Sequence, residues 1–254
     1  MHPILFRLAG MTFYTQTFLT ILAFIIGLLV AAREGKKFAI PRVDMTSVVL
    51  VSFLGAIVGA RIFFLLLVHG PSAVTLREIL MSGRRESGFS FHGGVIFGAL
   101  FGMIAARSYQ IRLWRLADSL APGLASAMFF LRLGCLCNGC DYGVVTTVPW
   151  ALPLYGEFRH PIQIYEGVGN LLLLPCLAWL NSKPLRQGRT FWLYLFLSSL
   201  LRFLVDFYRD DPQKTFQGMT IAQLIAGGLA AGAGGIMFLT MLKTSPTEAQ
   251  RRKD

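Results

Sequence analysis

Charged side chains are scarce in this chain. Asp, Glu, Lys and Arg make up 15% of its 254 residues, whereas hydrophobic residues make up 54%. The mean hydropathy is +0.58, which is too apolar for a soluble globular domain of ordinary composition. The composition therefore indicates an integral membrane protein.

Acidic residues are the scarcer charge: 13 Asp and Glu against 24 Lys and Arg give a net charge of +11. Such an excess can indicate a nucleic-acid partner, but that requires a continuous basic face with interleaved aromatic residues. The chain has no such face, because its basic residues fall mainly between long apolar segments. We therefore expect no nucleic-acid partner, and we attribute the charge to membrane topology.

Three further features are missing. The start, "MHPILFRLAG", has no clustered basic region and no small-residue cleavage site follows, so we expect the first hydrophobic segment to remain in the protein. Internal repeats and low-complexity linkers are absent, which predicts a single domain over residues 1–254. Two symmetric halves with interrupted hydrophobic segments are also absent, which argues against an ion transporter.

Long apolar stretches dominate what is present. A helix needs about 20 mainly apolar residues to cross the hydrocarbon core of a bilayer. Seven stretches satisfy this requirement, and we expect an all-α membrane protein. They lie at roughly 12–32, 46–68, 91–106, 116–134, 163–181, 190–208 and 219–242.

Positive charge predicts the orientation of these spans, since Lys and Arg are enriched on the cytoplasmic side. The connections after the first, third, fifth and seventh spans hold 14 of the 24 basic residues, and the opposite side holds 7. We therefore expect the N-terminus outside and the C-terminus in the cytoplasm. The long outer connection, residues 135–162, carries prolines and aromatics and is expected to form a small cap.

Ionisable side chains inside the apolar segments mark the candidate site. A charge near mid-bilayer costs about 2.5 to 3.5 kcal/mol on insertion scales, so each one implies a partner or a polar cavity. Such residues are Arg61, His92, Arg132, and Arg202 with Asp206 four residues later. They could simply fix helix packing through ion pairs. Alternatively, two converging arginines would bind an anion, since a guanidinium matches phosphate oxygens two at a time, and in a membrane that phosphate is a phospholipid head group.

Several motifs in order along nearly the whole chain resemble the prolipoprotein diacylglyceryl transferase family. Each motif is weak alone, and the combination is specific. They are "MHPILFRLAGMTFYT" at the start, "GARIFF" from 59, "SGFSFHGGVIFG" from 87, "LADSLAPGL" from 116, "RLGCLCNGCDYG" from 132, "HPIQIYEG" from 160, "LRFLVDFYRDDP" from 201 and "GMTIAQLI" from 218.

This resemblance implies transfer of the diacylglyceryl group from phosphatidylglycerol to the lipobox cysteine of a prolipoprotein, giving a thioether and glycerol phosphate. Arg132 and Arg202 would hold the phosphate, and His92 would accept the thiol proton or orient the head group. Further residues would shape the substrate site: Tyr14, Arg61, Gly93, Gly94, Asn138, Gly143, Gln163, Glu166 and Asp206. The resemblance also implies a bacterial inner-membrane protein, expected to be a monomer, that needs no cofactor or metal.

The chain departs from the family signature at four positions, one of which is Ser198 in place of a Tyr four residues before Arg202. Cys135 stands in place of an Asn, Cys140 in place of a Glu, and Asp206 in place of a Glu. The exchanges at 135 and 140 remove two hydrogen-bonding groups from the rim of the expected cavity. The two cysteines could form a disulfide or pack as small apolar side chains at a helix end. Metal binding by Cys135, Cys137 and Cys140, with Asp141 or His160 as the fourth ligand, ranks last, because the spacing matches no common zinc or haem signature.

Two other functions remain open on the sequence. A relic with the same fold could bind or move phospholipid, or act on another substrate, without forming the thioether. A membrane thiol oxidoreductase could use the cysteine cluster, but no Cys-x-x-Cys at the start of a helix in a soluble redox domain is visible. The transferase predicts that Arg132, Arg202 and His92 converge on one lipid-accessible cavity.

Overall fold

The computed structural model describes residues 3–8, 11–71, 74–75, 78–79, 88, 90–210, 214–216 and 218–242. Arg77, Arg84, Arg85 and the basic tail from Lys243, which enter the topology argument, lie outside these residues. The chain divides into two compact units, Gly35–Leu116 and the remainder, Met1–Glu34 with Ala117–Asp254. The expectation of one functional domain stays a prediction.

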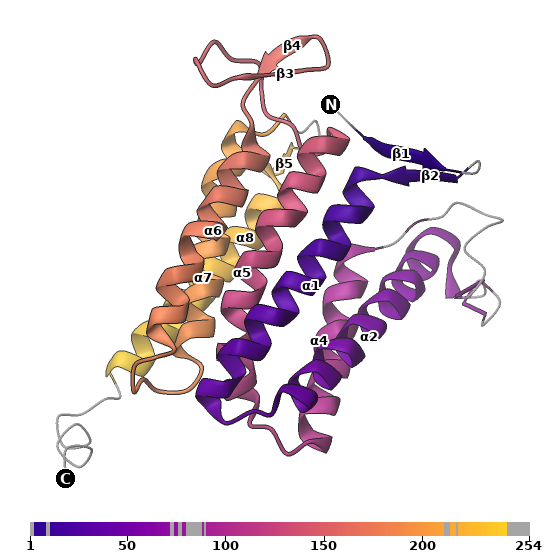
Figure 1. Cartoon of the computed structure of the whole chain (residues 1–254). Helices are drawn as coiled ribbons and strands as arrows, with labels where there is room; N and C mark the ends of the chain where they lie inside the picture. Colours follow the sequence, from indigo (N-terminus) through magenta and orange to yellow (C-terminus); the bar gives the residue numbers. More distant parts are fainter. Residues whose placement is uncertain are drawn as a thin grey trace. The chain divides into compact units, whose positions relative to one another are not determined.

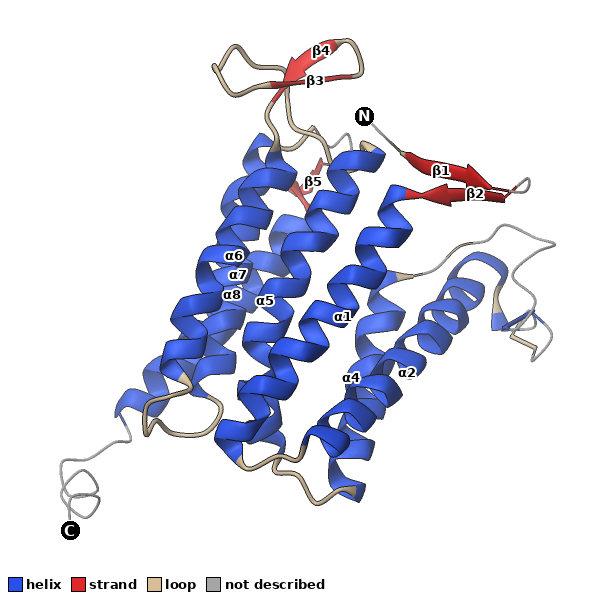
Figure 2. Cartoon of the chain, viewed as in Figure 1, coloured by secondary structure: helices blue, strands red, loops and turns tan. Residues whose placement is uncertain are grey.

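The larger unit is a bundle of helices with short hairpins at one end (Figures 1 and 2). Its helices are α1 (Thr15–Gly35), α5 (Leu113–Asn138), α6 (Ile162–Leu180), α7 (Arg189–Val205), the 3-10 helix η3 (Asp206–Tyr208) and α8 (Ile221–Leu242). Its antiparallel hairpins are β1 (Ile4–Leu8) with β2 (Met11–Tyr14), β3 (Leu152–Leu154) with β4 (Glu157–Arg159), and β5 (Lys214–Phe216) with β6 (Met219–Thr220).

Small residues let these helices approach closely, as expected where lipid surrounds a bundle. A Cβ on Gly27 of α1 would lie 3.2 Å from the Gly123 carbonyl oxygen of α5. In the same way, Gly169 of α6 receives the side chain of Leu201 of α7, and Gly227 of α8 receives Phe203. These contacts therefore hold α1 against α5, and α6 and α8 against α7.

Two helix starts have clear local causes. Gly188, just before α7, adopts φ +89°, which glycine reaches without steric cost. Thr220 and Gln223 form a capping box at the start of α8: the Gln223 N–H donates to Thr220 Oγ1 (3.1 Å), and the Thr220 N–H donates to Gln223 Oε1 (2.9 Å). The box fixes the position of the Thr220 side chain.

The smaller unit contains the short 3-10 helix η1 (Lys36–Phe38) and pairs α2 (Arg42–His69) with α4 (Phe91–Ser108). The glycines of α4 face α2. A Cβ on Gly93 would collide with Phe63 and with the Gly59 carbonyl oxygen, and one on Gly98 would lie 3.1 Å from the Cβ of Ala56. These glycines are therefore required by the contact between the two helices.

All seven predicted apolar segments are α-helices. Five of the described helices, α1, α2, α5, α7 and α8, are long and apolar enough to cross a membrane. Large apolar side chains lie exposed on the bundle surface, among them Leu29 (64%), Leu172 (68%) and Phe238 (63%), as expected for surfaces in contact with lipid. The chain is therefore a membrane protein, and its orientation stays a prediction.

Two predicted boundaries differ from the structure by a few residues. The first helix begins at Thr15, because residues 11–14 pair with β1 in a hairpin. The outer connection begins after Asn138 and not at 135, because α5 continues through the cysteine segment. The outer connection contains the β3–β4 hairpin, which lies beyond the ends of α5 and α6 (Figure 1).

Candidate active site

Three arginines and three carboxylates form a closed ring of alternating charges at the end of the larger unit where α5 ends. Each carboxylate contacts two arginines, and each arginine contacts two carboxylates, so the formal charge of the ring is zero. We call it the arginine–carboxylate ring. In order around the ring, its members are Arg132, Asp141, Arg209, Asp206, Arg202 and Glu166.

Glu166, in the first turns of α6, joins the two arginines that the sequence singled out. Its Oε2 lies 2.6 Å from Nε of Arg132, on α5, and its Oε1 accepts a hydrogen bond of 2.6 Å from Nη1 of Arg202, on α7. The Glu166 side chain is 5% exposed, against 18% and 21% for the two arginines. One buried carboxylate therefore holds the arginines of two helices side by side.

Asp206 forms the second buried corner of the ring. Its Oδ1 lies 3.3 Å from Nη2 of Arg202, the pair that the four-residue spacing predicted, and 3.5 Å from Nη1 of Arg209. The hydroxyl of Thr220 donates to its Oδ2 at 2.7 Å. The side chain is fully buried, so both of its oxygens have partners that offset the cost of burial.

Asp141 closes the ring on its more exposed side. Its Oδ2 accepts a 2.8 Å hydrogen bond from Nη1 of Arg132, and its Oδ1 accepts one from Nη2 of Arg209. Burial raises the pKa of Asp141, but the charges of Arg209, Arg132 and Arg202 outweigh burial and hold this pKa below its usual value of 3.8. Asp141 is therefore ionised at neutral pH.

Backbone pairing brings Asp141 and Arg209 together although they are far apart in the sequence. The Val144 N–H donates to the Tyr208 carbonyl (2.8 Å), and the Asp210 N–H donates to the Tyr142 carbonyl (3.1 Å). Gly143 lies between them, paired with Arg209. A Cβ at Gly143 would collide with the His160 carbonyl oxygen, which explains why the motif ends in glycine.

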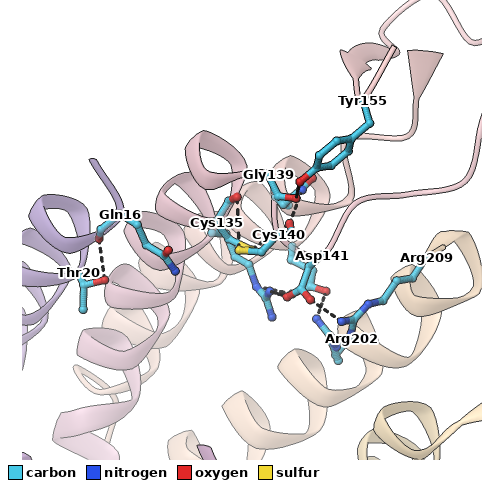
Figure 3. The surroundings of a disulfide bond; sticks show 12 residues. Gln16, Thr20, Cys135, Gly139, Cys140, Asp141, Tyr155, Arg202 and Arg209 are labelled. Carbon is cyan, nitrogen blue, oxygen red and sulfur yellow. Dashed lines mark hydrogen bonds and ion pairs between the residues drawn. A yellow bond between two sulfur atoms is a disulfide. The ribbon is translucent and has the colours of Figure 1, made fainter. Parts of the chain in front are cut away.

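A disulfide joins Cys135, in the last turn of α5, to Cys140, just before Asp141 (Figure 3). Gln163 of α6 donates from Nε2 to the Cys140 carbonyl at 2.7 Å, and the Tyr155 hydroxyl donates to the Gly139 carbonyl at 3.0 Å. Gln163 thus supports this turn. Asn138, also within it, is exposed at the end of α5, and Tyr14 is 52% exposed at the end of β2.

The remaining predicted site residues belong to the smaller unit. His92 lies exposed in the first turn of α4, beside Gly93 and Gly94. Arg61 of α2 is 2% exposed and donates from Nε to the Glu78 carbonyl and from Nη1 to the Gly88 carbonyl, both at 3.2 Å. The structure thus gathers Arg132, Arg202, Glu166 and Asp206 in one site and assigns His92 and Arg61 to the other unit.

The ring is suited to bind an anion. A guanidinium has five N–H donors. Nη1 of Arg132 and Nη1 of Arg202 donate hydrogen bonds to carboxylates, and Nε of Arg132 and Nη2 of Arg202 lie at ion-pair distance from one. The remaining N–H groups match the oxygens of a phosphate, and the carboxylates fix the guanidinium planes before the anion arrives. Among the described residues, no group of three or more His, Cys, Asp and Glu is arranged to hold a metal ion.

Three members of this network were missed in the sequence. All three lie within the family motifs, but Asp141 was considered only as a conceivable metal ligand, Arg209 only as a loop charge, and Thr220 was given no role. Asp206 and Arg209 are three residues apart, which was a usable signal. Asp141 follows Cys140, the position where the family signature has Glu. The carboxylate of Asp141 thus joins the ring from the position next to Cys140.

Comparison with known proteins identifies the family of this chain. The family model for prolipoprotein diacylglyceryl transferase matches residues 3–240. A protein of Geobacter sulfurreducens named phosphatidylglycerol–prolipoprotein diacylglyceryl transferase is 33% identical over 246 residues, covering 94% of this chain and 93% of its own length. Proteins of the same name from Bordetella avium (29% identical, 91% and 87% covered) and Clostridium tetani (26%, 89% and 92%) match as well. This chain therefore belongs to the prolipoprotein diacylglyceryl transferase family.

Proposed function

We propose that this protein transfers the diacylglyceryl group of phosphatidylglycerol to the lipobox cysteine of a prolipoprotein, the first step of lipoprotein maturation. The observation that carries the proposal is the arginine–carboxylate ring, in which Arg132 and Arg202 share the buried Glu166. Membership of the family and the apolar helices support the same conclusion.

The reaction makes one bond and breaks one. The cysteine sulfur forms a C–S bond to the glyceryl carbon next to the phosphate ester, the C–O bond of that ester breaks, and glycerol phosphate leaves with the electron pair. Negative charge grows on the departing phosphate oxygen, where a fixed guanidinium stabilises the transition state more than the ground state. Arg132 and Arg202 supply this charge, and the carboxylates of the ring keep their guanidiniums in place.

The thiol must lose its proton, because the free pKa of cysteine is about 8.5 and the thiolate is the nucleophile. We assign His92 as the group that accepts this proton or orients the head group. Its exposed position at the start of α4 supports access to a substrate. Arg61, Gly93, Gly94, Tyr14, Asn138, Gly143 and Gln163 are proposed to shape the substrate site.

We further propose that the protein acts as a monomer in the bacterial cytoplasmic membrane, as one functional domain. The N-terminus and the β3–β4 hairpin would lie outside, where prolipoproteins present their lipobox after export. The excess of Lys and Arg in alternate connections supports this orientation.

The test is to incubate the purified protein with phosphatidylglycerol and a lipobox peptide and to measure the diacylglyceryl adduct by mass spectrometry. Arg132→Ala and Arg202→Ala should each reduce adduct formation by at least about a hundredfold, as for loss of a transition-state charge contact. Arg189→Ala is the matched control, because Arg189 is an exposed arginine at the other end of α7. Phospholipid binding without an adduct in the intact protein would instead support a lipid-binding relic.

A further inference from the structure

The turn between α5 and Asp141 is held from three sides. The disulfide links Cys135 to Cys140, and the Cys140 N–H also donates to the Cys135 carbonyl at 3.0 Å. Gln163, from α6, and Tyr155, from the β3–β4 hairpin, bind the Cys140 and Gly139 carbonyls. The covalent bond is the part of this arrangement that connects the turn to the helix carrying Arg132.

Asp141 takes its direction from this turn. Its φ is +52°, the left-handed conformation that only a few non-glycine residues adopt. Cys140, its immediate neighbour, is one end of the disulfide. Figure 3 shows the Asp141 carboxylate beside the disulfide, directed toward Arg209. The disulfide therefore helps to fix where this carboxylate lies.

Asp141 is also the carboxylate of the ring that a ligand reaches first. Its side chain is 27% exposed, whereas Glu166 is 5% exposed and Asp206 is fully buried. Glu166 and Asp206 are held by helices and by Thr220, so they keep the inner side of the ring without the turn. On the more exposed side of the ring, Asp141 contacts Nη1 of Arg132 and Nη2 of Arg209 and so fixes the direction of these two guanidiniums.

We propose that Asp141 is a positioning residue for the phosphate site and that the Cys135–Cys140 disulfide holds it in place. Binding of the phosphate of the donor lipid then depends on the oxidised state of this disulfide. The inference rests on the proposed function for the identity of the ligand. It agrees with the proposed outer location of the turn, since disulfides persist in oxidising compartments.

Reduction by dithiothreitol tests the role of the bond. The reagent supplies two electrons and two protons, the S–S bond breaks into two thiols, and dithiothreitol becomes a cyclic disulfide. We expect the KM for phosphatidylglycerol to rise about tenfold, equivalent to losing one charge-assisted hydrogen bond, with kcat changed less than about twofold. Mass spectrometry of alkylated protein establishes that the bond is broken.

Variants separate this account from a general loss of structure. Cys135→Ser with Cys140→Ser should have the KM of the reduced protein and no response to dithiothreitol, whereas Cys137→Ser, the matched control at a free cysteine of the same turn, should behave as the wild type. Asp141→Asn should raise the KM by a similar factor and should not respond to the reagent, because both changes act through one carboxylate. Asp141→Glu should recover part of the affinity.

Two results would overturn the inference: an unchanged KM in the fully reduced protein, or an Asp141→Asn variant that still responds to dithiothreitol by the wild-type factor. Native mass spectrometry of phosphatidylglycerol retained by the oxidised and reduced protein gives a readout without catalysis. Absence of the adduct from the oxidised wild type would contradict the proposed function. If the oxidised protein in that case still retained more phosphatidylglycerol than the reduced protein, the role of the disulfide would still be supported.

Discussion

The two ends of α5 both bury carboxylates, but they hold them in different ways. Asp118, near the start of α5, accepts hydrogen bonds from the backbone N–H groups of Gly188 (2.6 Å) and Phe191 (2.9 Å) at the start of α7. Asn181 donates to the Asp118 carbonyl and to Glu34, both at 3.0 Å. At the other end of α5, Arg132 and its ring partners meet carboxylates with guanidiniums.

The difference separates a structural cluster from a candidate site. At the Asp118 end, the positive end of the α7 dipole is already occupied by a carboxylate, so this end links α1, α5 and α7 with the end of α6 and offers little to an anion. At the ring end, the carboxylates contact Nε and Nη1 of Arg132 and Nη1 and Nη2 of Arg202. Nη2 of Arg132 and Nε of Arg202 are the donors that we propose bind an anion. Buried charge alone therefore does not identify a binding site. Guanidinium N–H groups that the carboxylates do not contact are the better indication.

Glu166→Gln should have the largest effect. It leaves Arg132 and Arg202 without their shared charge partner, and breaking a buried ion pair costs about 3 to 5 kcal/mol of stability. We expect loss of thermal stability together with at least about a hundredfold loss of kcat/KM, as both guanidiniums change direction. The measurements are thermal unfolding in detergent and the adduct assay. An unaffected kcat/KM would contradict the central position of Glu166.

Asp118→Asn should affect stability alone. The amide keeps the shape of the side chain but loses the charge that binds the start of α7, and we expect a cost of about 1 to 3 kcal/mol. Measured at a temperature where the variant is folded, its KM and kcat should equal those of the wild type. A raised KM would mean that the two ends of α5 are coupled and that the Asp118 cluster is not purely structural.

Thr220→Val should have a smaller effect, of about 1 to 2 kcal/mol, because it removes one hydrogen bond to the buried Asp206. It also removes the capping contact to Gln223. We expect a rise of a few fold in the KM for phosphatidylglycerol. Thr240→Val, on the helix that Thr220 caps, is the control, because the Thr240 hydroxyl donates to the Met237 carbonyl of its own helix. Equal effects of the two variants on KM would contradict a role for Thr220 in the ring.

The smallest effect is on pH dependence. The pKa of Asp141 is lowered below 3.8 on folding, so its stabilising contribution is complete above that value and is lost as the pH falls through the folded pKa. The stability difference between the wild type and Asp141→Asn should therefore be constant from pH 8 to about pH 5 and should shrink below about pH 4. A difference that shrinks already between pH 8 and pH 6 would show that Asp141 is not the group responsible.

The seven helices and the pair of Arg202 with Asp206 were predictable, because hydropathy and the helical period act over neighbouring residues. The ring was predictable only in part. Its closure depends on residues 142–144 pairing with residues 208–210, a contact between segments far apart in the sequence that no local pattern encodes. Asp141 was considered only as a metal ligand, because its contact with Arg209 depends on this distant pairing.

The most direct test asks whether the arginine–carboxylate ring recognises the phosphate of phosphatidylglycerol. The protein would be purified in nanodiscs containing equal amounts of phosphatidylglycerol and diacylglycerol, and the retained lipid would be counted by native mass spectrometry. We predict that the wild type and Arg189→Ala retain phosphatidylglycerol preferentially and that Arg132→Ala and Arg202→Ala lose this preference. An undiminished preference in both ring variants would contradict the account, since the phosphate would then be bound elsewhere.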